Sequence, residues 1–356
     1  MPPDDQDAVA VALSGGVDSA VAASLLMEQG YAVFGVHLLL AENSLPGEHL
    51  QALSDALGIR LTILDLREEF AAGVVQYFLQ TYARGQTPNP CVKCNAVIKF
   101  GVLWDIVQKM GAGHLATGHY VQLRRGPEGE PALYRGRDRS KDQSYFLCQL
   151  PRRILPHVLF PLGEFTKDEV RRRARRIGLP LLESCPESQE ICFIKDERYL
   201  DFIKRRRGCL GPPGDVVDRQ GHVVGRHRGL ACHTVGQRRG LGIPGPEPYY
   251  VLEIQPETNR LVVGPRQELF SHGLKACEVN WLIPPPTSEL EGTAVIRYRH
   301  PGVAARIIPG KAGEVEVIFA APQSAVAPGQ AVAFYKNDRL LGGGWIVERI
   351  NEGAKG

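Results

Sequence analysis

A short loop of glycine and serine residues near the N-terminus limits the folds that this chain can adopt. Residues 14–19 are Ser-Gly-Gly-Val-Asp-Ser, between an apolar, valine-rich run at 8–13 and a helix-forming segment at 19–29. The run is typical of a buried parallel strand, and the glycines allow a tight turn into a helix. Backbone N–H groups at such a helix start can hold a pyrophosphate. The competing interpretation is a plain turn with Asp18 or Ser19 as the helix cap.

Strand-like and helical segments alternate after this loop, as they do in a doubly wound parallel sheet. We therefore expect residues 1–207 to form an α/β domain with a helical extension. No G-x-x-x-x-G-K-[ST] sequence occurs, which disfavours an enzyme that transfers the γ-phosphate. The further predicted strands are 31–40, 60–64 and 114–118, and the further predicted helices are 47–58, 102–110 and 167–177.

The sequence changes character near Gly208, where glycine, proline and short alternating stretches replace the helical patterns. We expect a small β-rich central domain at 208–275 and a C-terminal β-barrel at 276–356. The candidate barrel strands are 293–298, 304–308, 314–319, 331–335 and 341–350.

Composition argues against several classes of protein. No apolar run approaches the roughly 20 residues of a membrane-spanning helix, and the N-terminus is acidic where a signal peptide would be basic. We therefore expect a cytoplasmic protein with no membrane partner. Eight irregularly spaced cysteines do not form the pattern of a disulfide framework. They are available for structural, metal-binding or catalytic roles.

Arginine is abundant between positions 152 and 239, although the formal net charge is only +3. The predicted helix at 167–177 places Val170, Ala174 and Ile177 on one face and leaves its arginines largely outside that face. Such a basic surface either contacts phosphates or is simply solvated, and the sequence leaves both interpretations open.

Two cysteines stand close together in a proline-bounded segment. Residues 87–95 are Thr-Pro-Asn-Pro-Cys-Val-Lys-Cys-Asn, which we expect to form a stiff loop before a helix that begins at Ile98. There the helix dipole and Lys93 or Lys99 would stabilise a thiolate. A third cysteine, Cys192, lies between apolar neighbours, where a packing role is the default.

Several kinds of site remain open for these cysteines. Structural zinc takes four ligands, and no second C-x-x-C or C-x-x-H pair with suitable spacing is present. A thioredoxin-like pair needs a fold that the pattern lacks. An iron–sulfur cluster held by Cys91, Cys94 and Cys192, with one open iron, remains an alternative.

Together these motifs resemble those of the tRNA-specific 2-thiouridylases, a family of the PP-loop pyrophosphatase superfamily with an adenine nucleotide alpha-hydrolase-like fold. The resemblance runs along nearly the whole chain. Its other motifs are A-T-G-H-Y at 116–120, K-D-Q-S-Y-F-L at 141–147, S-Q-E-I-C-F-I at 188–194, T-V-G-Q-R-R-G-L-G-I at 234–243 and R-Y-R at 297–299.

The resemblance implies that ATP adenylates the C2 oxygen of the wobble uridine, with AMP and pyrophosphate as products. Cys192 would carry a persulfide that delivers sulfur to C2. Cys94 would release that sulfur and leave a Cys94–Cys192 disulfide for an outside thiol to reduce. The implied partners are the anticodon stem-loop of tRNA and a sulfur donor protein or other persulfide source. Mg²⁺ is expected with ATP on general grounds.

The resemblance also implies binding roles for individual residues. A base under attack must leave its stack, so we expect a pocket at 89–91. The nucleotide would contact Ala12, Leu13, Ser14, Gly15, Gly16, Val17, Asp18, Ser19, Leu38 and Gly118. The tRNA would contact Asn89, Pro90, Cys91, His119, Lys141, Asp142, Gln143, Arg297, Tyr298, Arg299 and Gln330.

One position departs from the family pattern. Cys91 stands where many members have an aspartate, and this third cysteine favours the iron–sulfur alternative. Two other functions compete with tRNA thiolation. Another PP-loop enzyme that adenylates a different substrate would not need three cysteines or a barrel, and an iron–sulfur RNA-binding protein would not need the loop at 14–19.

Overall fold

The computed structural model describes residues 8–41, 47–178, 191–194, 197–244, 247–311 and 313–351. The chain forms two compact units, each built from segments that are separated in the sequence. The domain boundaries given above remain predictions. Unit 1 contains Met1–Gly73, Cys91–Lys195 and Asp338–Leu340, and unit 2 contains Val74–Pro90, Asp196–Asn337 and Leu341–Gly356.

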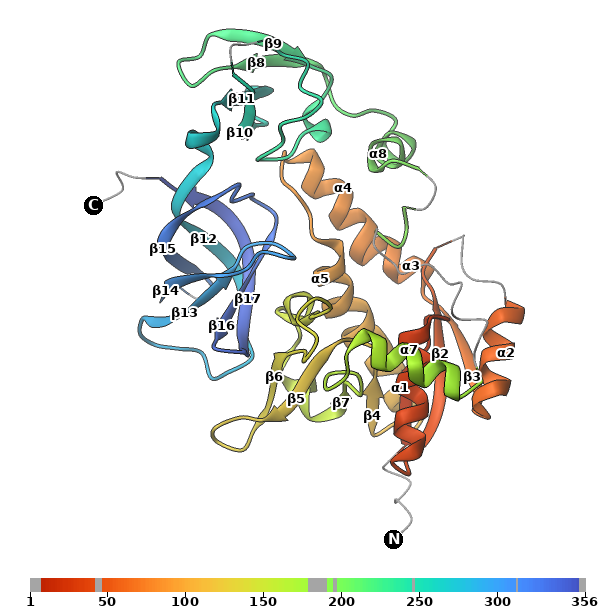
Figure 1. Ribbon diagram of the computed structural model, residues 1–356. Helices are drawn as coiled ribbons and strands as arrows, with labels where there is room; N and C mark the ends of the chain where they lie inside the picture. The colour runs from red at the N-terminus through yellow and green to blue at the C-terminus, as the bar shows by residue number, and fades with distance from the viewer. Residues whose placement is uncertain are drawn as a thin grey trace. The chain divides into compact units, whose positions relative to one another are not determined.

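Unit 1 contains a sheet in which neighbouring strands run parallel (Figure 1). The order β3-β2-β1-β4-β7 places β2 and β3 on one side of β1 and the later strands on the other. This confirms the predicted doubly wound sheet. Such sheets bind ligands at the carboxyl ends of the strands where the order reverses, which here are β1 and β4. The strands are β1 (Ala8–Ala12), β2 (Ala32–Leu39), β3 (Leu61–Asp65), β4 (His114–Ala116) and β7 (Val158–Leu159).

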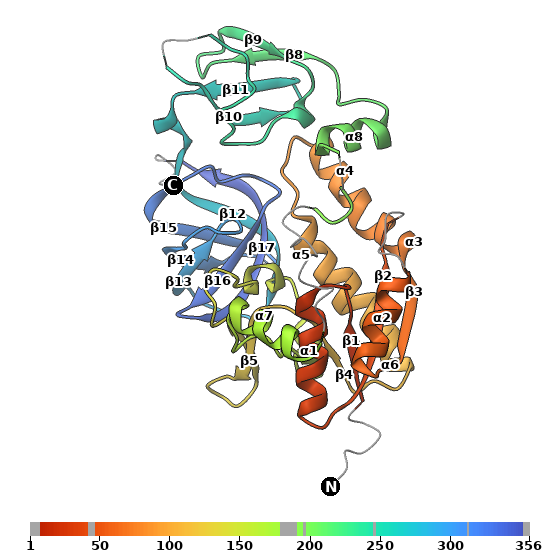
Figure 2. The same ribbon diagram turned by 45° about the vertical axis from the view of Figure 1, so that its right-hand side comes forward.

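Helix α1 (Val17–Glu28) is buried on two sides. Ala20 and Leu26 pack with β1 and α2 (Gly47–Leu57), whereas Val21 and Leu25 pack with α7 (Lys167–Arg176). Both ribbon views show α1 and α7 side by side (Figures 1 and 2). The apolar residues all round α1 therefore fix it between the sheet and a second helix.

Helix α7 has the amphipathic pattern expected for 167–177. Val170 and Ala174 are buried and Ile177 packs beside them, as predicted. The helix begins with a capping box in which the Thr166 side chain accepts from the Glu169 N–H and the Glu169 carboxylate accepts from the Thr166 N–H. This cap fixes the first residue of the helix, Lys167, in place.

The C-x-x-C pair lies in a helix that begins earlier than predicted. Helix α5 (Pro90–Cys94), a π-helical segment (Asn95–Val102) and α6 (Leu103–Lys109) follow one another directly. The predicted loop up to Ile98 is wrong, because Pro90 occupies the first helical position, where its missing N–H is not needed. The other elements here are α3 (Arg67–Phe70), a π-helical Ala71–Val75, β5 (Val121–Arg125), β6 (Pro131–Arg135) and 3₁₀ turns at Ser144–Leu147 and Arg152–His157.

The central part of unit 2 is a four-stranded sheet in the order β10-β11-β8-β9. Its core contains Val216, Val251, Leu261 and Val263. The predicted β-rich character of this region is confirmed. The elements are α4 (Gln76–Ala83), α8 (Tyr199–Arg207), β8 (Gly214–Val217), β9 (Val223–His227), a 3₁₀ turn (Leu230–Cys232), β10 (Tyr250–Gln255), β11 (Arg260–Gly264) and a 3₁₀ turn (Arg266–Leu269).

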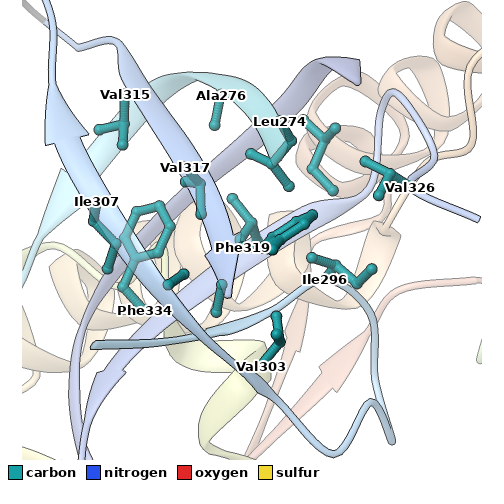
Figure 3. Packing of buried hydrophobic residues seen from close by; sticks show 14 of the residues in the cluster. Leu274, Ala276, Ile296, Val303, Ile307, Val315, Val317, Phe319, Val326 and Phe334 are labelled. Carbon is teal, nitrogen blue, oxygen red and sulfur yellow. The ribbon is translucent and has the colours of Figure 1, made fainter. Parts of the chain in front are cut away.

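The C-terminal strands form a closed antiparallel barrel, because β12 pairs with both β15 and β17. Alternate residues of β14 point inward, with Val303, Ala305 and Ile307 buried. Figure 3 shows Val303 and Ile307 close to Val317, Phe334 and their neighbours inside the barrel. The barrel was predicted, but β12 was not, because its Gly, His and Lys interrupt the apolar pattern. The strands are β12 (Phe270–Trp281), β13 (Leu290–Val295), β14 (Val303–Pro309), β15 (Val315–Ser324), β16 (Ala331–Lys336) and β17 (Arg339–Ile350).

We predict that Phe334→Ala destabilises the barrel by about 3–5 kcal/mol, because it leaves a cavity in place of a fully buried ring. The Trp281 and Phe334 ring centroids are 5.6 Å apart, so tryptophan fluorescence during urea unfolding reports on this site. Phe270→Ala is the matched control: its side chain is 42% exposed and the loss should be below about 1 kcal/mol. Equal losses from the two variants would contradict the described core.

Candidate active site

The loop between β1 and α1 is closed by its own serine side chains. The Ser14 N–H donates to Ser19 Oγ at 3.2 Å, and the Ser19 hydroxyl donates to the Gly16 carbonyl at 3.0 Å. Gly15 has φ +82°, a conformation that favours glycine. The residue at the cap position of α1 is Gly16, with no side-chain cap hydrogen bond, so the interpretation of Asp18 or Ser19 as the cap is wrong. The first turn of α1 therefore suits an anion.

Asp18, in the first turn of α1, is neutralised by groups from distant parts of the chain. Lys167 Nζ lies 2.7 and 2.8 Å from its two carboxylate oxygens, and the Tyr120 hydroxyl donates to one of them at 2.8 Å. Lys167 is itself buried. An unpaired carboxylate beside a bound pyrophosphate would repel it, so this ion pair keeps the loop suited to an anionic ligand.

Gly118 brings the segment after β4 into contact with the loop. A Cβ atom on Gly118 would lie 2.9 Å from both the Asp18 carbonyl carbon and the Ser19 nitrogen. These are backbone atoms, which cannot move aside as a flexible side chain can. The predicted ligand-binding ends of β1 and β4 are therefore joined by a contact that only glycine permits.

Two histidines contact backbone carbonyl groups of the loop. His37 Nδ1 lies 2.7 Å from the Leu13 carbonyl oxygen and His49 Nε2 lies 3.0 Å from that of Gly15. Burial lowers the pKa of His37, which keeps its ring neutral. Ala12 and Leu13 join β1 to the loop, and Leu38 is half-buried near the end of β2. The structure thus brings together the predicted loop residues, while the nucleotide contacts themselves remain predictions.

The three cysteines of the family motifs, Cys91, Cys94 and Cys192, belong to unit 1. Cys91 is exposed and Cys94 is buried, one helical turn apart. Cys192 is also exposed: the buried Ile194 and the Phe193 ring, 5.5 Å from the Phe70 ring, hold its segment. The packing interpretation of Cys192 is therefore wrong. Residues 188–190 of this motif, and Cys185, lie outside the described residues.

Burial raises the pKa of the Cys94 thiol to about 12. The Lys99 ammonium opposes this rise, while Cys192 and Cys91 add to it, so these groups share one electrostatic environment. The expected stabilisation of a thiolate by Lys99 has the predicted direction, but desolvation outweighs it and the pKa of Cys94 stays raised. Lys99 lies five residues after Cys94, and the π-helical segment brings it nearer to the face of Cys94 than an α-helix would.

His119 lies beside the same lysine. Its ring is half-buried between the rings of Phe100 and Phe160, and its Nδ1 lies 2.7 Å from the Thr117 hydroxyl. Burial lowers the pKa of His119 well below 6.5, and Lys99 lowers it further. His119 is therefore a neutral group at neutral pH.

The segment 141–143 is tied into unit 1. The Asp142 carboxylate accepts from the Gly136 N–H at 2.9 Å, from the Ser144 hydroxyl at 3.0 Å and from Arg135 at 3.2 Å. Gln143 Oε1 accepts from the Tyr120 N–H at 3.0 Å. Lys141 is half-buried. These contacts order the segment, and a contact of residues 141–143 with tRNA remains a prediction.

The other predicted tRNA contacts belong to unit 2. Asn89 Nδ2 donates to Gln330 Oε1 at 3.4 Å, so two of them touch one another. On the barrel, Arg297 and Arg299 are exposed, and the Arg299 guanidinium lies 5.5 Å from the centre of the Tyr298 ring. This ring and its two arginines suit stacking on a base and contact with phosphate.

The basic surfaces outside these segments contain both paired and solvated arginines. On α7, Arg171 pairs with Asp168 and Arg173 with Glu28. On α8, Arg205 pairs with Glu197, whereas Arg206 and Arg207 are exposed. The two ion pairs on α7 reduce the number of its arginines available to phosphate, and phosphate binding by the others stays a prediction.

Metal ligands are not preassembled in the part of the chain that the structure describes. Within the described ranges, no group of three His, Cys, Asp or Glu side chains is arranged to hold a metal ion. Cys91, Cys94 and Cys192 therefore do not form a three-ligand site as placed here. In the same described ranges, no helix has the length and apolar character needed to cross a bilayer.

Comparison with known proteins places the chain in one family. Three family models match: "tRNA methyl transferase HUP domain" at 7–196, "tRNA methyl transferase PRC-barrel domain" at 200–265 and "Aminomethyltransferase beta-barrel domain" at 271–346. A tRNA-specific 2-thiouridylase of Magnetococcus marinus is 46% identical, covering 95% of this chain and 98% of its own. That of Geobacter metallireducens is 43% identical, covering 97% and 98%.

The chain belongs to the tRNA-specific 2-thiouridylase family. The resemblance drawn from the motifs is thus confirmed along the full length. A solved 4-thiouridine synthetase–RNA complex with bound ATP is also similar, at 18% identity over 56% of this chain and 50% of that one, but its TM-score of 0.37 is too low to support an argument.

Sequence patterns missed several neighbours of the loop in this family member. Lys167 was seen only as the start of a basic helix, and Tyr120 only as the end of a motif. Ion pairing across 149 residues has no local pattern in the sequence. The one signal in the sequence that could have marked Lys167 is its place directly after a threonine that can cap the helix.

We predict that Gly118→Ala weakens ATP binding more than tenfold, because the added Cβ would overlap loop backbone. Isothermal titration with ATP measures the change. Gly47→Ala is the matched control, since a Cβ there meets nothing within 4 Å. Unchanged ATP affinity in Gly118→Ala would show that the loop does not bind the nucleotide in this form.

We also predict that alkylation of Cys94 speeds up steadily from pH 7 to 10 without a plateau, because the pKa of about 12 keeps it a thiol through this range. The thiolate fraction, and so the rate, should rise about tenfold per pH unit. Lys99→Met should slow the reaction, since Lys99 lowers that pKa. Iodoacetamide labelling followed by peptide mass spectrometry measures both, with exposed Lys109→Met as control. A plateau below pH 9 would contradict the burial argument.

Proposed function

We propose that this chain is a tRNA-uridine 2-sulfurtransferase that consumes ATP. The observation that supports it most is the full-length similarity to tRNA-specific 2-thiouridylases, together with the placement of the loop and all three motif cysteines in unit 1. The substrate is the wobble uridine in the anticodon stem-loop of tRNA, and the reaction takes place in the cytoplasm. Products are 2-thiouridine, AMP and pyrophosphate.

The first step is activation of the uridine. The loop at 14–19 and the first turn of α1 hold the phosphates of ATP, and the Asp18–Lys167 pair keeps that region free of net negative charge. The C2 oxygen attacks the α-phosphorus and pyrophosphate leaves, which makes C2–O a good leaving group. Mg²⁺ is expected to accompany ATP.

The second step is sulfur transfer. Exposed Cys192 suits loading by an outside sulfur donor, which leaves a persulfide on its sulfur. The terminal sulfur attacks C2 and AMP leaves, joining Cys192 to the base through a disulfide. The Cys94 thiol, once deprotonated, attacks Cys192 Sγ. This releases 2-thiouridine and forms the Cys94–Cys192 disulfide. Outside thiols then supply the two electrons that reduce this disulfide.

In this scheme Lys99 helps to convert the Cys94 thiol into a thiolate. Burial holds Cys94 in its protonated form, and the thiolate is the nucleophile. The Lys99 cation favours that thiolate electrostatically. We expect this half-buried ammonium to stabilise the charge that develops on Cys94 as it is deprotonated.

The iron–sulfur mechanism is the second candidate, since Cys91 adds a third thiol. It requires all three sulfurs to converge on one metal cluster. In the persulfide scheme Cys91 has no chemical step. The two candidates therefore differ in what they require of Cys91.

We test the function by ATP-dependent thiolation of unmodified tRNA after anaerobic purification, with iron and acid-labile sulfide measured. Cys94→Ser and Cys192→Ser should each lower the rate more than 100-fold, and Cys91→Ser should keep activity with a persulfide donor. Cys209→Ser, at an exposed cysteine outside the motifs, is the control.

Other outcomes separate the candidates. Activity that follows iron content and is lost in all three motif variants supports the cluster mechanism. Absence of thiolation with any donor, in protein that binds ATP, would overturn the proposed function and favour a PP-loop enzyme with another substrate.

A further inference from the structure

The segment that precedes the cysteine helix is fastened to one turn of the C-terminal barrel. The Thr87 N–H donates to the Pro328 carbonyl at 2.8 Å, and Gln330 Nε2 donates to the Pro88 carbonyl at 3.2 Å. Gln330 Oε1 in turn accepts from Asn89 Nδ2 at 3.4 Å. All of these residues belong to unit 2. We call residues 327–330 the barrel turn.

Gln330 uses both ends of its side-chain amide in these contacts. The donor and the acceptor are each engaged with the segment 88–89, across 242 and 241 positions of sequence. These two contacts leave one N–H and one oxygen lone pair of the amide available, but together they fix its orientation against the segment. Its geometry suits a positioning residue.

The barrel turn is itself rigid. The Gly329 N–H donates to the Ile346 carbonyl and the Ile346 N–H donates to the Gln330 carbonyl, both at 2.8 Å, which fixes the turn to β17. Gly329 has φ +89°, and a Cβ on it would lie 2.9 Å from Thr87 backbone atoms and from Gln86 Cβ. The close approach of the two backbones therefore requires glycine at this position.

A second contact fixes the segment from its other side. The Asn89 N–H donates to the Tyr77 hydroxyl oxygen at 3.2 Å, and the Tyr77 ring lies 5.4 Å from that of Trp345 on β17. Asn89 is buried as a result. Main chain and side chain of this residue are both held, one residue before the helix that starts at Pro90 and carries Cys91.

We propose that the barrel turn, acting through Gln330 as a positioning residue, sets the geometry of Asn89 and the start of the cysteine helix and thereby the rate of thiolation. Only the effect on the rate of thiolation rests on the proposed function; the effect on the geometry of Asn89 does not. The barrel thus contributes to the chemical step as well as to RNA binding.

The test uses the full-length chain with Gln330→Ala and Gly329→Ala. Hydrogen exchange of the Thr87 and Asn89 amides, measured by mass spectrometry on peptides spanning 84–94, should become about tenfold faster in both variants. The kcat for thiolation should fall about tenfold, while the KM and Kd for unmodified tRNA change less than about twofold.

Two control variants match these changes. Gly221→Ala places a Cβ at φ +88° with nothing within 4 Å, so it carries the backbone strain without the overlap. Gln323→Ala removes another barrel glutamine, whose Nε2 bonds to the Ala321 and Pro322 carbonyls and not to the segment. Neither should change exchange at 87–89 or the kcat.

The results separate this inference from the proposed function. A tenfold rise in tRNA Kd for Gln330→Ala, with unchanged kcat and unchanged exchange, would overturn the inference and assign Gln330 to direct RNA contact. If the wild-type chain thiolates no tRNA, the proposed function fails. Exchange at Thr87 and Asn89 then still decides whether the barrel turn holds the segment.

Discussion

The contact between Gly118 and the backbone of Asp18 and Ser19 is the constraint on which unit 1 depends. The strand order reverses between β1 and β4, so the loops that leave these two strands emerge side by side. They can touch only because residue 118 has no side chain. The same approach brings Tyr120 within hydrogen-bonding distance of Asp18, where Lys167 from α7 completes the neutralisation. Contacts from these separate segments thereby hold the loop in a form suited to an anion.

A second balance governs the cysteines. Burial protects Cys94 from reagents but raises its pKa, whereas Lys99 lowers it. Cys192 is exposed, as the proposed loading with sulfur requires. The proposed reaction needs one accessible thiol and one protected thiol. The difference in burial between Cys192 and Cys94 meets this need. The π-helical segment after Cys94 sets where Lys99 stands relative to the thiol.

In unit 2, long-range hydrogen bonds join the segment 87–89 to the barrel turn. The barrel core is independent of these bonds, because its inward-facing residues pack among themselves (Figure 3). Because the core does not depend on the turn contacts, the barrel can remain stable while its turn, which contains Gly329, positions the segment 87–89. The segment 74–90 and the barrel belong to the same unit, whereas the cysteines that follow the segment in the chain belong to the other.

Much of this protein is determined by its sequence, because local patterns have local causes. The Ser-Gly-Gly-Val-Asp-Ser loop, the alternating strands and helices, the amphipathic α7 and the barrel strands after 290 follow from glycine conformation and apolar periodicity. The start of the cysteine helix at Pro90, strand β12 and the protonation of Cys94 did not follow, since helix extent, strand pairing and desolvation depend on partners elsewhere. The Asp18–Lys167 pair and the Gln330 contacts were decided by tertiary structure alone. They join residues about 150 and 240 positions apart, a distance over which the sequence contains no pairing signal.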